Sequence, residues 1–402
     1  MRILYLHQYF CTPQSSGGVR SYEFARRWVE AGHEVEVVTG TGYDPTLPAN
    51  GITVIDGISV RCVGVKYHAK MGFIRRLWAF TLFALKASWR AARSRDCDLV
   101  LATSTPLTIA IPALCAKWIA RRPMVFEVRD VWPDAAIDIG QLNSPLLIGL
   151  ARCLEKTVYR AADHVVPLST GMRDRINGKG VLESKMTMIP NCCDLKRFAH
   201  GRRERFRTEL GCQDKFVILY VGAINAANHI EALADSIDLL QVEENWEWWF
   251  VGGGNRFDWL EQQARLRNWH GVRLLGPQTR DEVVDYAAGA DCGVISFIPK
   301  PVYYENSPNK FFDYIAASLP VVFSRSTWLQ DVIAEYKAGF IGADGDAHQL
   351  VDHLLRLKHD PVLRKRMGRD ARRMAEERFS RDEMAKRYLE LFHRVIADSV
   401  KR

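Results

Sequence analysis

The sequence lacks the patterns that mark several common classes of protein. Its nine cysteines include no C-x-x-C pair, so we interpret them as reduced thiols rather than as disulfides or a zinc site. The uncharged run from Leu77 to Leu85 is nine residues long, which is too short to span a bilayer. The chain starts with an apolar strand pattern at 2–6, and no signal peptide is expected there.

Motifs for dinucleotides, nucleic acids and metals are also missing. The loop after the first strand contains Gly17-Gly18 instead of the G-x-G-x-x-G of a nicotinamide-dependent oxidoreductase or epimerase. No recognised nucleic-acid-binding module is present, so no nucleic-acid partner is expected. Two Asp-x-Asp patterns, at 96–98 and 344–346, are interpreted as turn acids, and no metal is expected.

Acidic residues are absent from one long stretch. The chain has a net charge of +8, and all of this excess lies in residues 1–190. Within that half, residues 57–95 hold nine Lys or Arg and no Asp or Glu. A surface of one sign favours an anionic partner, such as a membrane, a nucleic acid or a phosphorylated lipid.

Short apolar strands that alternate with helices are present along the whole chain. Strands without polar alternation are typical of parallel sheets that are covered on both faces. At 402 residues the chain fits two such α/β domains. We therefore predict two Rossmann-like, doubly wound domains at 1–192 and 193–380 that face each other across a cleft, with a final helix at 381–402 returning to the first domain.

The segment Tyr304 to Asp313 combines helix-start signals with charged residues. Ser307 is predicted to cap a helix whose first residue is Pro308. The free N–H groups of that helix, together with Lys310, would attract a phosphate. The acids at 305 and 313 would accept hydrogen bonds from a sugar nucleotide. The same local pattern also fits an ordinary capped helix with two solvated acids.

An ordered set of motifs makes the reading more specific. The sequence resembles glycosyltransferase family 4, of the GT-B fold, and within it the bacterial O-antigen, colanic-acid and capsule branch that includes fucosamine-transferase-like enzymes. The resemblance spans nearly the whole chain. It is carried by the loop at 6–20 with its glycine pair, the Pro-Asn-Cys-Cys-Asp segment at 190–194, Tyr-Val-Gly at 220–222, Val-Gly-Gly-Gly at 251–254, and two acids eight residues apart before Pro-Val-Val at 320–322.

The resemblance implies roles for individual residues. Glu305 would contact the hydroxyls of the donor sugar as a catalytic residue, and Asp313 would hold the ribose. The remaining implied donor-binding residues are Gly17, Gly18, Gly222, Gly252, Gly253, Ser307, Pro308, Asn309 and Lys310.

Three positions depart from the family pattern. Asp313 stands where the family usually has Glu. The segment 222–229 contains no Lys or Arg, so the diphosphate charge must be met by Lys310, Arg325, Arg20 or a helix N-terminus. Arg129 occupies the position of a common histidine, which makes Asp130 the candidate acceptor-side base, with the acids at 134 and 138 behind it.

The family implies a retaining transfer without a metal or other cofactor. The expected donor is a nucleotide sugar, with UDP favoured and N-acetylfucosamine a candidate sugar. The expected acceptor is a saccharide linked to polyprenyl diphosphate, as in cell-surface polysaccharide synthesis. Transfer to a soluble small acceptor, and a catalytically weak membrane-binding partner subunit, remain alternatives.

One basic and aromatic stretch predicts where a membrane would be met. The expected acceptor or membrane contacts are Arg75, Arg76, Trp78, Phe80 and Phe83. Aromatic residues flanked by cations suit the membrane interface, although core packing explains an apolar helix equally well. The chain is therefore expected in the cytoplasm, bound peripherally to the cytoplasmic face of the inner membrane.

Overall fold

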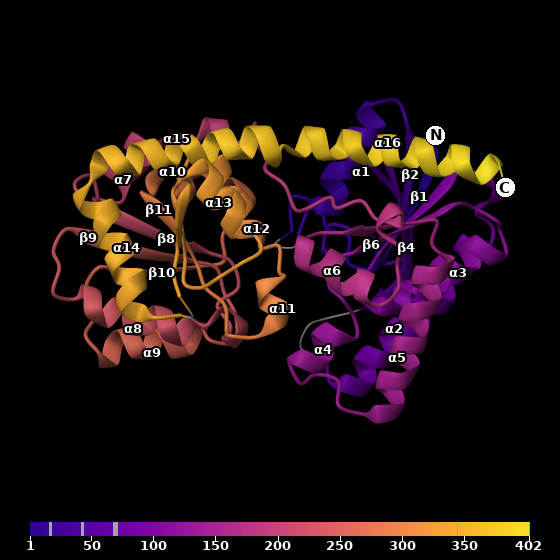
Figure 1. Cartoon of the computed structure of the whole chain (residues 1–402), viewed down its shortest axis with the longest axis horizontal. Helices are drawn as coiled ribbons and strands as arrows, with labels where there is room; N and C mark the ends of the chain where they lie inside the picture. Colours follow the sequence, from indigo (N-terminus) through magenta and orange to yellow (C-terminus); the bar gives the residue numbers. More distant parts are fainter. Residues whose placement is uncertain (16–17, 42–43, 67–70, 344, 402) are drawn as a thin grey trace. The chain divides into compact units, whose positions relative to one another are not determined.

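A computed structural model of the chain describes residues 1–402 except 16–17, 42–43, 67–70, 344 and 402. The chain forms two compact units (Figure 1). Unit 1 comprises residues 1–190 and 382–402, and unit 2 comprises residues 191–381.

In unit 1 the described residues form a seven-stranded sheet in the order β3-β4-β2-β1-β5-β6-β7. All neighbouring strands are parallel except the hairpin β3–β4. The strands are β1 (Arg2–Leu6), β2 (Glu34–Thr41), β3 (Gly51–Ile55), β4 (Ile58–Lys66), β5 (Leu99–Thr103), β6 (Met124–Val128) and β7 (His164–Pro167). The helices are α1 (Arg20–Glu30), α2 (Phe73–Ala91), α3 (Ala110–Trp118), α4 (Asp134–Asp138), α5 (Pro145–Ala161), α6 (Thr170–Gly178) and α16 (Arg381–Val400).

In unit 2 the described residues form a six-stranded parallel sheet in the order β10-β9-β8-β11-β12-β13. The strands are β8 (Phe216–Val221), β9 (Trp246–Val251), β10 (Val272–Gly276), β11 (Cys292–Ile295), β12 (Val321–Phe323) and β13 (Gly339–Ile341). The helices are α7 (Arg203–Glu209), α8 (Ile230–Leu240), α9 (Phe257–Leu266), α10 (Arg280–Gly289), α11 (Pro301–Tyr304), α12 (Asn309–Ala316), α13 (Gln330–Tyr336), α14 (Ala347–His359) and α15 (Pro361–Arg378).

The strands are buried on both faces, as their composition predicts. Every residue of β5, β6, β8 and β9 is buried. Separate hydrophobic clusters lie on the two faces of the unit 2 sheet, because alternate residues of β8 belong to different clusters. The predicted pair of Rossmann-like α/β domains with parallel sheets is confirmed.

Each sheet has one point where the strand order reverses. In unit 1 it lies between β1 and β5, and in unit 2 it lies between β8 and β11. Loops that leave two adjacent parallel strands in opposite directions open a crevice at the carboxyl ends of the strands, which is where ligands bind in this class of sheet. The residues just after β1, β5, β8 and β11 therefore border the two crevices.

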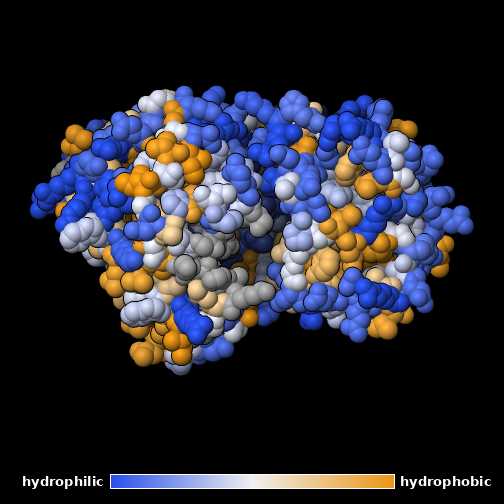
Figure 2. Space-filling view, turned by 180° about the vertical axis from the view of Figure 1, so that it is seen from behind, coloured by the Kyte–Doolittle hydropathy of each residue, from blue (hydrophilic) through white to orange (hydrophobic). Residues whose placement is uncertain are grey.

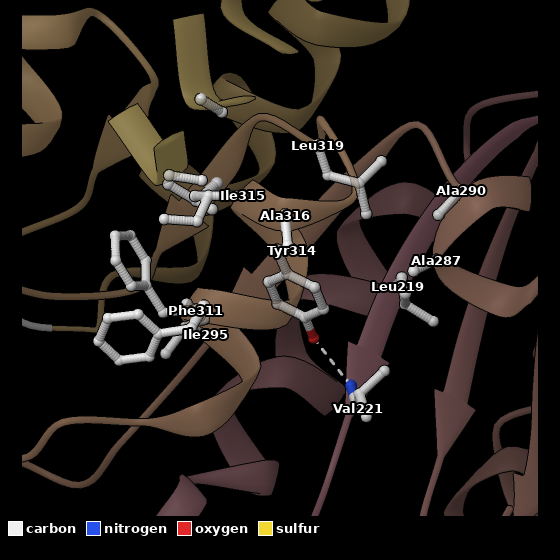
Figure 3. Close-up of a cluster of buried hydrophobic side chains, with 14 of the residues drawn as sticks. Leu219, Val221, Ala287, Ala290, Ile295, Phe311, Tyr314, Ile315, Ala316 and Leu319 are labelled. Carbon is white, nitrogen blue, oxygen red and sulfur yellow. Dashed lines mark hydrogen bonds between the residues drawn. The ribbon is translucent and has the colours of Figure 1, made fainter. Parts of the chain in front are cut away.

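Helix α12 is fixed tightly against the unit 2 sheet (Figure 3). The ring of Tyr314 lies over Gly293 of β11, where an added Cβ would approach the ring to 2.2 Å. The Tyr314 hydroxyl accepts a hydrogen bond of 2.8 Å from the backbone N–H of Val221, the last residue of β8. This buried contact sets the position of the helix start relative to the reversal point.

Residues 382–402 complete unit 1 by packing against α1 (Figure 1). Trp28 of α1 is fully buried, and its indole N–H donates to the carbonyl of Ala385. Tyr388 and Phe392 of α16 pack edge-on against the Trp28 ring. The last helix is thus part of the core of unit 1.

None of the described helices combines the length and the apolar character that crossing a bilayer requires.

Tyr314→Phe should weaken unit 2. The change removes the acceptor of the Val221 N–H, and an unsatisfied buried donor costs about 1–3 kcal/mol. The measurement is the free energy of unfolding in urea. As a control, Tyr304→Phe removes the hydroxyl of a side chain that is 42% exposed and should change the free energy by less than about 0.5 kcal/mol. Equal effects of the two variants would contradict the role of Tyr314.

Candidate functional site

The candidate site in unit 2 lies where β8 and β11 diverge. After β8 the chain makes a short 3-10 turn, Ala226–Asn228, before α8. After β11 it continues through α11 to the segment 304–308 and then α12. The two loops are joined by a backbone hydrogen bond from Ile298 to the carbonyl of Ala227. Both loops thus border the reversal point of the sheet.

The segment that carries Glu305 is held on both sides. The indole N–H of Trp328 donates to the carbonyl of Asn306, and the backbone N–H of Trp328 donates to the carbonyl of Tyr304. Further along, the side-chain amide of Asn191 donates to the carbonyl of Ser307 at 2.6 Å. Glu305 itself is half-buried at the end of α11. Its backbone is therefore positioned by neighbours distant in sequence.

The predicted start of α12 is wrong by one residue. Pro308 is the N-cap, with extended dihedrals, and the helix begins at Asn309. Ser307 makes no capping hydrogen bond; its hydroxyl is buried and finds no partner among the described residues. Its carbonyl is fixed by Asn191 instead, which keeps it outside the helix. The N–H groups of the first turn are left without a side-chain cap.

Lys310 is the most unusual group of the site. Its side chain is buried, and Nζ lies 3.2 Å from Oδ1 of Asn228 and 3.9 Å from the centre of the Tyr220 ring. Within the described residues no carboxylate oxygen lies within 4 Å of Nζ. Burial lowers the pKa of Lys310 to about 7. The site therefore holds an amine whose protonated form is balanced by no carboxylate of the described residues.

Gly222 leaves room beside that amine. A Cβ at this position would lie 3.4 Å from Cε of Lys310, and the backbone has a φ of 121°. Gly252 is needed for the neighbouring turn, because its Cβ would lie 1.9 Å from the carbonyl oxygen of Gly222. Gly253 lies against Pro277. Close packing of the turns after β8 and β9 explains Gly252 and Gly253, and their predicted contact with a donor remains a prediction.

Asp313 has a partner that the sequence did not indicate. Arg280, the first residue of α10, makes a bidentate ion pair with it, and both N–O distances are 2.9 Å. Asp313 is buried, and its charge raises the pKa of the Arg280 guanidinium. Each carboxylate oxygen keeps a lone pair for a further donor. Arg280 therefore orients Asp313, and the predicted contact with a ribose remains a prediction.

Arg20 and Arg325, the two other side chains predicted to meet the diphosphate charge, lie in different surroundings. Arg20 of α1 is buried in unit 1, where it donates to Glu127 at 2.9 Å and to the carbonyls of residues 189 and 190. Its charge is already matched by Glu127. Arg325 is also buried, and it lies near His229, whose pKa falls through burial and the charge of Arg325. His229 precedes α8 in a left-handed conformation, in agreement with a helix-start role.

In unit 1, Asp130 lies just beyond β6. Its Oδ2 accepts a hydrogen bond of 2.9 Å from Thr105, which follows β5. The two acids behind it belong to a separate cluster: Asp134 pairs with Lys179 at 2.7 Å, and Asp138 lies 3.6 Å from Arg175. That pairing assigns both acids to the contact between α4 and α6. Of the glycine pair, Gly17 lies outside the described residues and Gly18 is exposed.

The predicted membrane contacts on α2 differ in how exposed their side chains are. Trp78 is 67% exposed, and Arg75 is also exposed. Arg76 and Phe80 are half-buried. Phe83 is fully buried in the hydrophobic core of unit 1, so its prediction as a surface contact is wrong. Its position on the inner face of the amphipathic helix explains the difference.

The described residues contain no group of three or more His, Cys, Asp or Glu side chains arranged to hold a metal ion. Asp98 accepts a hydrogen bond from the backbone N–H of Arg2, which is 96 positions away, and Asp346 caps α14.

Three positioning residues escaped the sequence analysis: Trp328, Arg280 and Asn228. Each acts on a residue that is distant in the chain, and no local pattern encodes such a pairing. Only the Thr279-x-x-Glu282 capping box was available as a signal, and it marks the start of the helix that carries Arg280.

Two family models match consecutive parts of the chain. Residues 17–192 match the model described as "Glycosyl transferase 4-like domain", and residues 202–374 match "Glycosyl transferases group 1". The first match lies almost entirely in unit 1 and the second lies in unit 2.

Individual relatives are distant. The chain is 23% identical over 228 residues to spore coat protein SA of Bacillus subtilis, which covers 52% of this chain and 59% of that protein. It is 21% identical over 394 residues to the N-acetyl-alpha-D-glucosaminyl L-malate synthase of Bacillus anthracis, covering 96% of both. The solved structure of Anabaena HepE in complex with UDP-glucose is similar with a TM-score of 0.72 at 16% identity, over 98% of this chain and 99% of that chain.

Lys310→Met should stabilise unit 2 most at neutral and lower pH. In the folded state the pKa of Lys310 is about 7, against 10.5 for an exposed lysine, so the unfolded state binds more protons between these values. The stability of the natural protein therefore rises with pH in that window, by on the order of 1 kcal/mol per pH unit. The apolar variant lacks this term, and its advantage should shrink between pH 7 and pH 9. Urea unfolding at both pH values measures it.

The matched control is Lys365→Met, which changes an exposed lysine on α15. It should show no pH-dependent difference. A pH-independent effect of Lys310→Met would mean that Lys310 is not desolvated.

Proposed function

Because the chain belongs to the glycosyltransferase family described by these two domain models, and has the GT-B fold of two Rossmann-like domains, we propose that it transfers a sugar from a nucleotide diphosphate sugar to an acceptor. The observation that carries this proposal is the buried Lys310 ammonium at the reversal point of the unit 2 sheet. A diphosphate is the ligand that its position favours.

The charge balance of the site supports a diphosphate. Burying an unpaired ammonium costs free energy, which a bound anion would recover. The uncapped first turn of α12 presents N–H groups and the positive end of the helix dipole beside the same amine. Gly222 lets a ligand approach without a Cβ in the way. Lys310 thus replaces the cations that are absent between 222 and 229.

The proposed donor is linked to UDP. HepE, which shares the fold, was solved with UDP-glucose. The resemblance to fucosamine-transferase-like enzymes makes N-acetylfucosamine the candidate sugar. In this proposal Glu305 contacts the sugar hydroxyls, Asp313 accepts from the ribose while Arg280 orients it, and the loop of Gly17 and Gly18 meets the diphosphate.

The proposed reaction retains the configuration at the sugar and uses no metal. The bond between the anomeric carbon and the diphosphate oxygen breaks, and a bond to the acceptor hydroxyl oxygen forms on the same face. The leaving diphosphate takes the electron pair, and Lys310 and the N–H groups of α12 stabilise its charge. Asp130 is the proposed group that takes the proton of the acceptor hydroxyl.

An exposed apolar surface on unit 1 supports the proposal of a lipid-linked acceptor (Figure 2). Helix α2 packs against α3, and α3 packs against α5. We call their outer residues the α2–α3–α5 surface. Its exposed large hydrophobic residues are Ile74, Leu77, Trp78, Leu85, Trp89, Ile111, Trp118, Ile119, Leu146 and Leu150.

Exposed cations accompany these hydrophobic residues. Arg93 stacks on the ring of Trp89 at 3.3 Å, and α2 contains no acidic residue. Other exposed cations on or beside the three helices are Arg75, Lys86, Arg95, Arg121, Arg152, Lys156 and Arg160. Apolar side chains flanked by cations suit an anionic lipid surface. We therefore propose peripheral binding to the cytoplasmic face of the inner membrane and a polyprenyl-diphosphate-linked acceptor.

A soluble small acceptor is the second candidate. The similarity to the N-acetyl-alpha-D-glucosaminyl L-malate synthase of Bacillus anthracis, over 96% of both chains, favours it. Transfer assays with and without lipid-linked saccharide separate the two.

Glu305→Gln should lower the rate of sugar transfer from a UDP-sugar by at least about a hundredfold, because it removes the charged acceptor for the sugar hydroxyls. UDP binding, measured by thermal shift, should remain. Glu335→Gln, an exposed acid on α13, serves as the control and should keep full activity. Normal transfer by Glu305→Gln would remove Glu305 from the reaction.

Replacing Trp78 and Trp89 together by Ser should reduce binding to anionic vesicles. Both side chains are about two-thirds exposed, so the change removes apolar contact area without opening a cavity in the core. Pelleting with vesicles containing phosphatidylglycerol should fall at least about tenfold. Leu182→Ser, which alters an equally exposed residue elsewhere on unit 1, should pellet normally. Undiminished pelleting of the double variant would refute membrane contact through this surface.

A further inference from the structure

A second charged group lies at the reversal point of the unit 1 sheet. Arg129 follows β6, and its backbone N–H donates to the hydroxyl of Ser104, which follows β5. Its guanidinium continues past β5 and lies 3.3 Å from Nε2 of His7, which follows β1. The strands are adjacent in the order β1-β5-β6. The Arg129 side chain thus crosses the carboxyl end of β5 to reach the crevice between β1 and β5.

The charge of Arg129 is not balanced locally. Glu127, the fully buried acid whose pKa the charge of Arg129 helps to lower, already accepts hydrogen bonds from Arg20 at 2.9 Å, from Thr103 at 2.5 Å and from Tyr388 at 2.5 Å. Burial raises the pKa of Glu127, but Arg20 and Arg129 outweigh it and hold the pKa at about 2. Two guanidinium groups therefore share one carboxylate. Among the described residues, no carboxylate oxygen lies within 4 Å of Arg129.

His7 adds a hydrogen-bond donor without adding charge. Burial and the neighbouring Arg129 lower the pKa of His7 to about 3, so its ring is neutral at physiological pH. Arg129 can only donate, so Nε2 of His7 accepts and the ring proton sits on Nδ1. This Nδ1 is buried and finds no partner among the described residues. A buried donor without a partner indicates a missing ligand or water.

We propose that the crevice between β1 and β5 of unit 1 binds a phosphate group, with the Arg129 guanidinium as its cation and Nδ1–H of His7 as a neutral donor. Guanidinium matches the geometry of phosphate oxygens, and the excess positive charge of the cluster is what a phosphate would neutralise. The owner of the phosphate rests on the proposed function: it is either the lipid diphosphate of the acceptor or the diphosphate of the donor.

The test follows the imidazole signals of His7 by NMR in the full chain labelled with ¹⁵N-histidine, assigned with His7→Gln. Adding inorganic pyrophosphate should shift the His7 signals saturably. Arg129→Met should weaken the pyrophosphate affinity reported by His7 at least tenfold. Arg129→Lys keeps the charge and should retain part of the affinity, which covers the case in which Arg129→Met does not fold. Lys365→Met changes an exposed lysine on α15 of unit 2 and should respond like the natural protein.

Two further ligands identify the owner of the phosphate. A shift of the His7 signals by farnesyl diphosphate but not by UDP assigns it to the acceptor, and a shift by UDP assigns it to the donor. Signals that none of the three ligands move, or an unchanged response in folded Arg129→Met, would overturn the proposal. If the natural protein transfers no sugar although its His7 signals respond to pyrophosphate, the result counts against the proposed function and not against the phosphate site.

Discussion

The site in unit 2 depends on one constraint, a buried lysine amine that has no carboxylate oxygen within 4 Å among the described residues. Lys310 lies between the Tyr220 ring and the Asn228 amide, at the point where β8 and β11 diverge. Burying such a group without a partner lowers the stability of the ligand-free protein. Proteins retain such groups mainly where a bound ligand offsets this loss of free energy. A diphosphate bound at the proposed site would thus recover free energy that folding loses when it buries this amine.

Holding that charge requires rigid neighbours. Tyr314 fixes α12 against the sheet, because its hydroxyl accepts from the backbone N–H of Val221 and its ring covers Gly293. The loop before α12 is fixed by hydrogen bonds from the side chains of Trp328 and Asn191 to its carbonyl groups. These anchors lie on different strands and loops, and they hold the backbone of the site in addition to the polar contacts of Lys310 with Asn228 and of Asp313 with Arg280. The cost of binding a donor is then mostly desolvation rather than reorganisation.

The sequence was sufficient for what depends on local pattern. Continuous apolar strands predicted two parallel sheets, and the spacing of Glu305, Lys310 and Asp313 predicted a charged helix start. It was insufficient where pairing is long-range: the Arg280–Asp313 ion pair joins residues 33 positions apart, and Glu127 and Tyr388 are 261 positions apart. Phe83 failed for a related reason, since composition shows that a helix is amphipathic but not which aromatic residues face the core.

The return of α16 to unit 1 has a consequence for synthesis on the ribosome. Tyr388 completes the hydrogen bonds of Glu127, and α16 covers Trp28, so the N-terminal unit lacks part of its interior until α16 has been translated. Unit 2, encoded entirely in between, meets no such delay. The part of the chain that emerges first is therefore the last to reach its native state, and while it waits it exposes apolar surface that chaperones recognise.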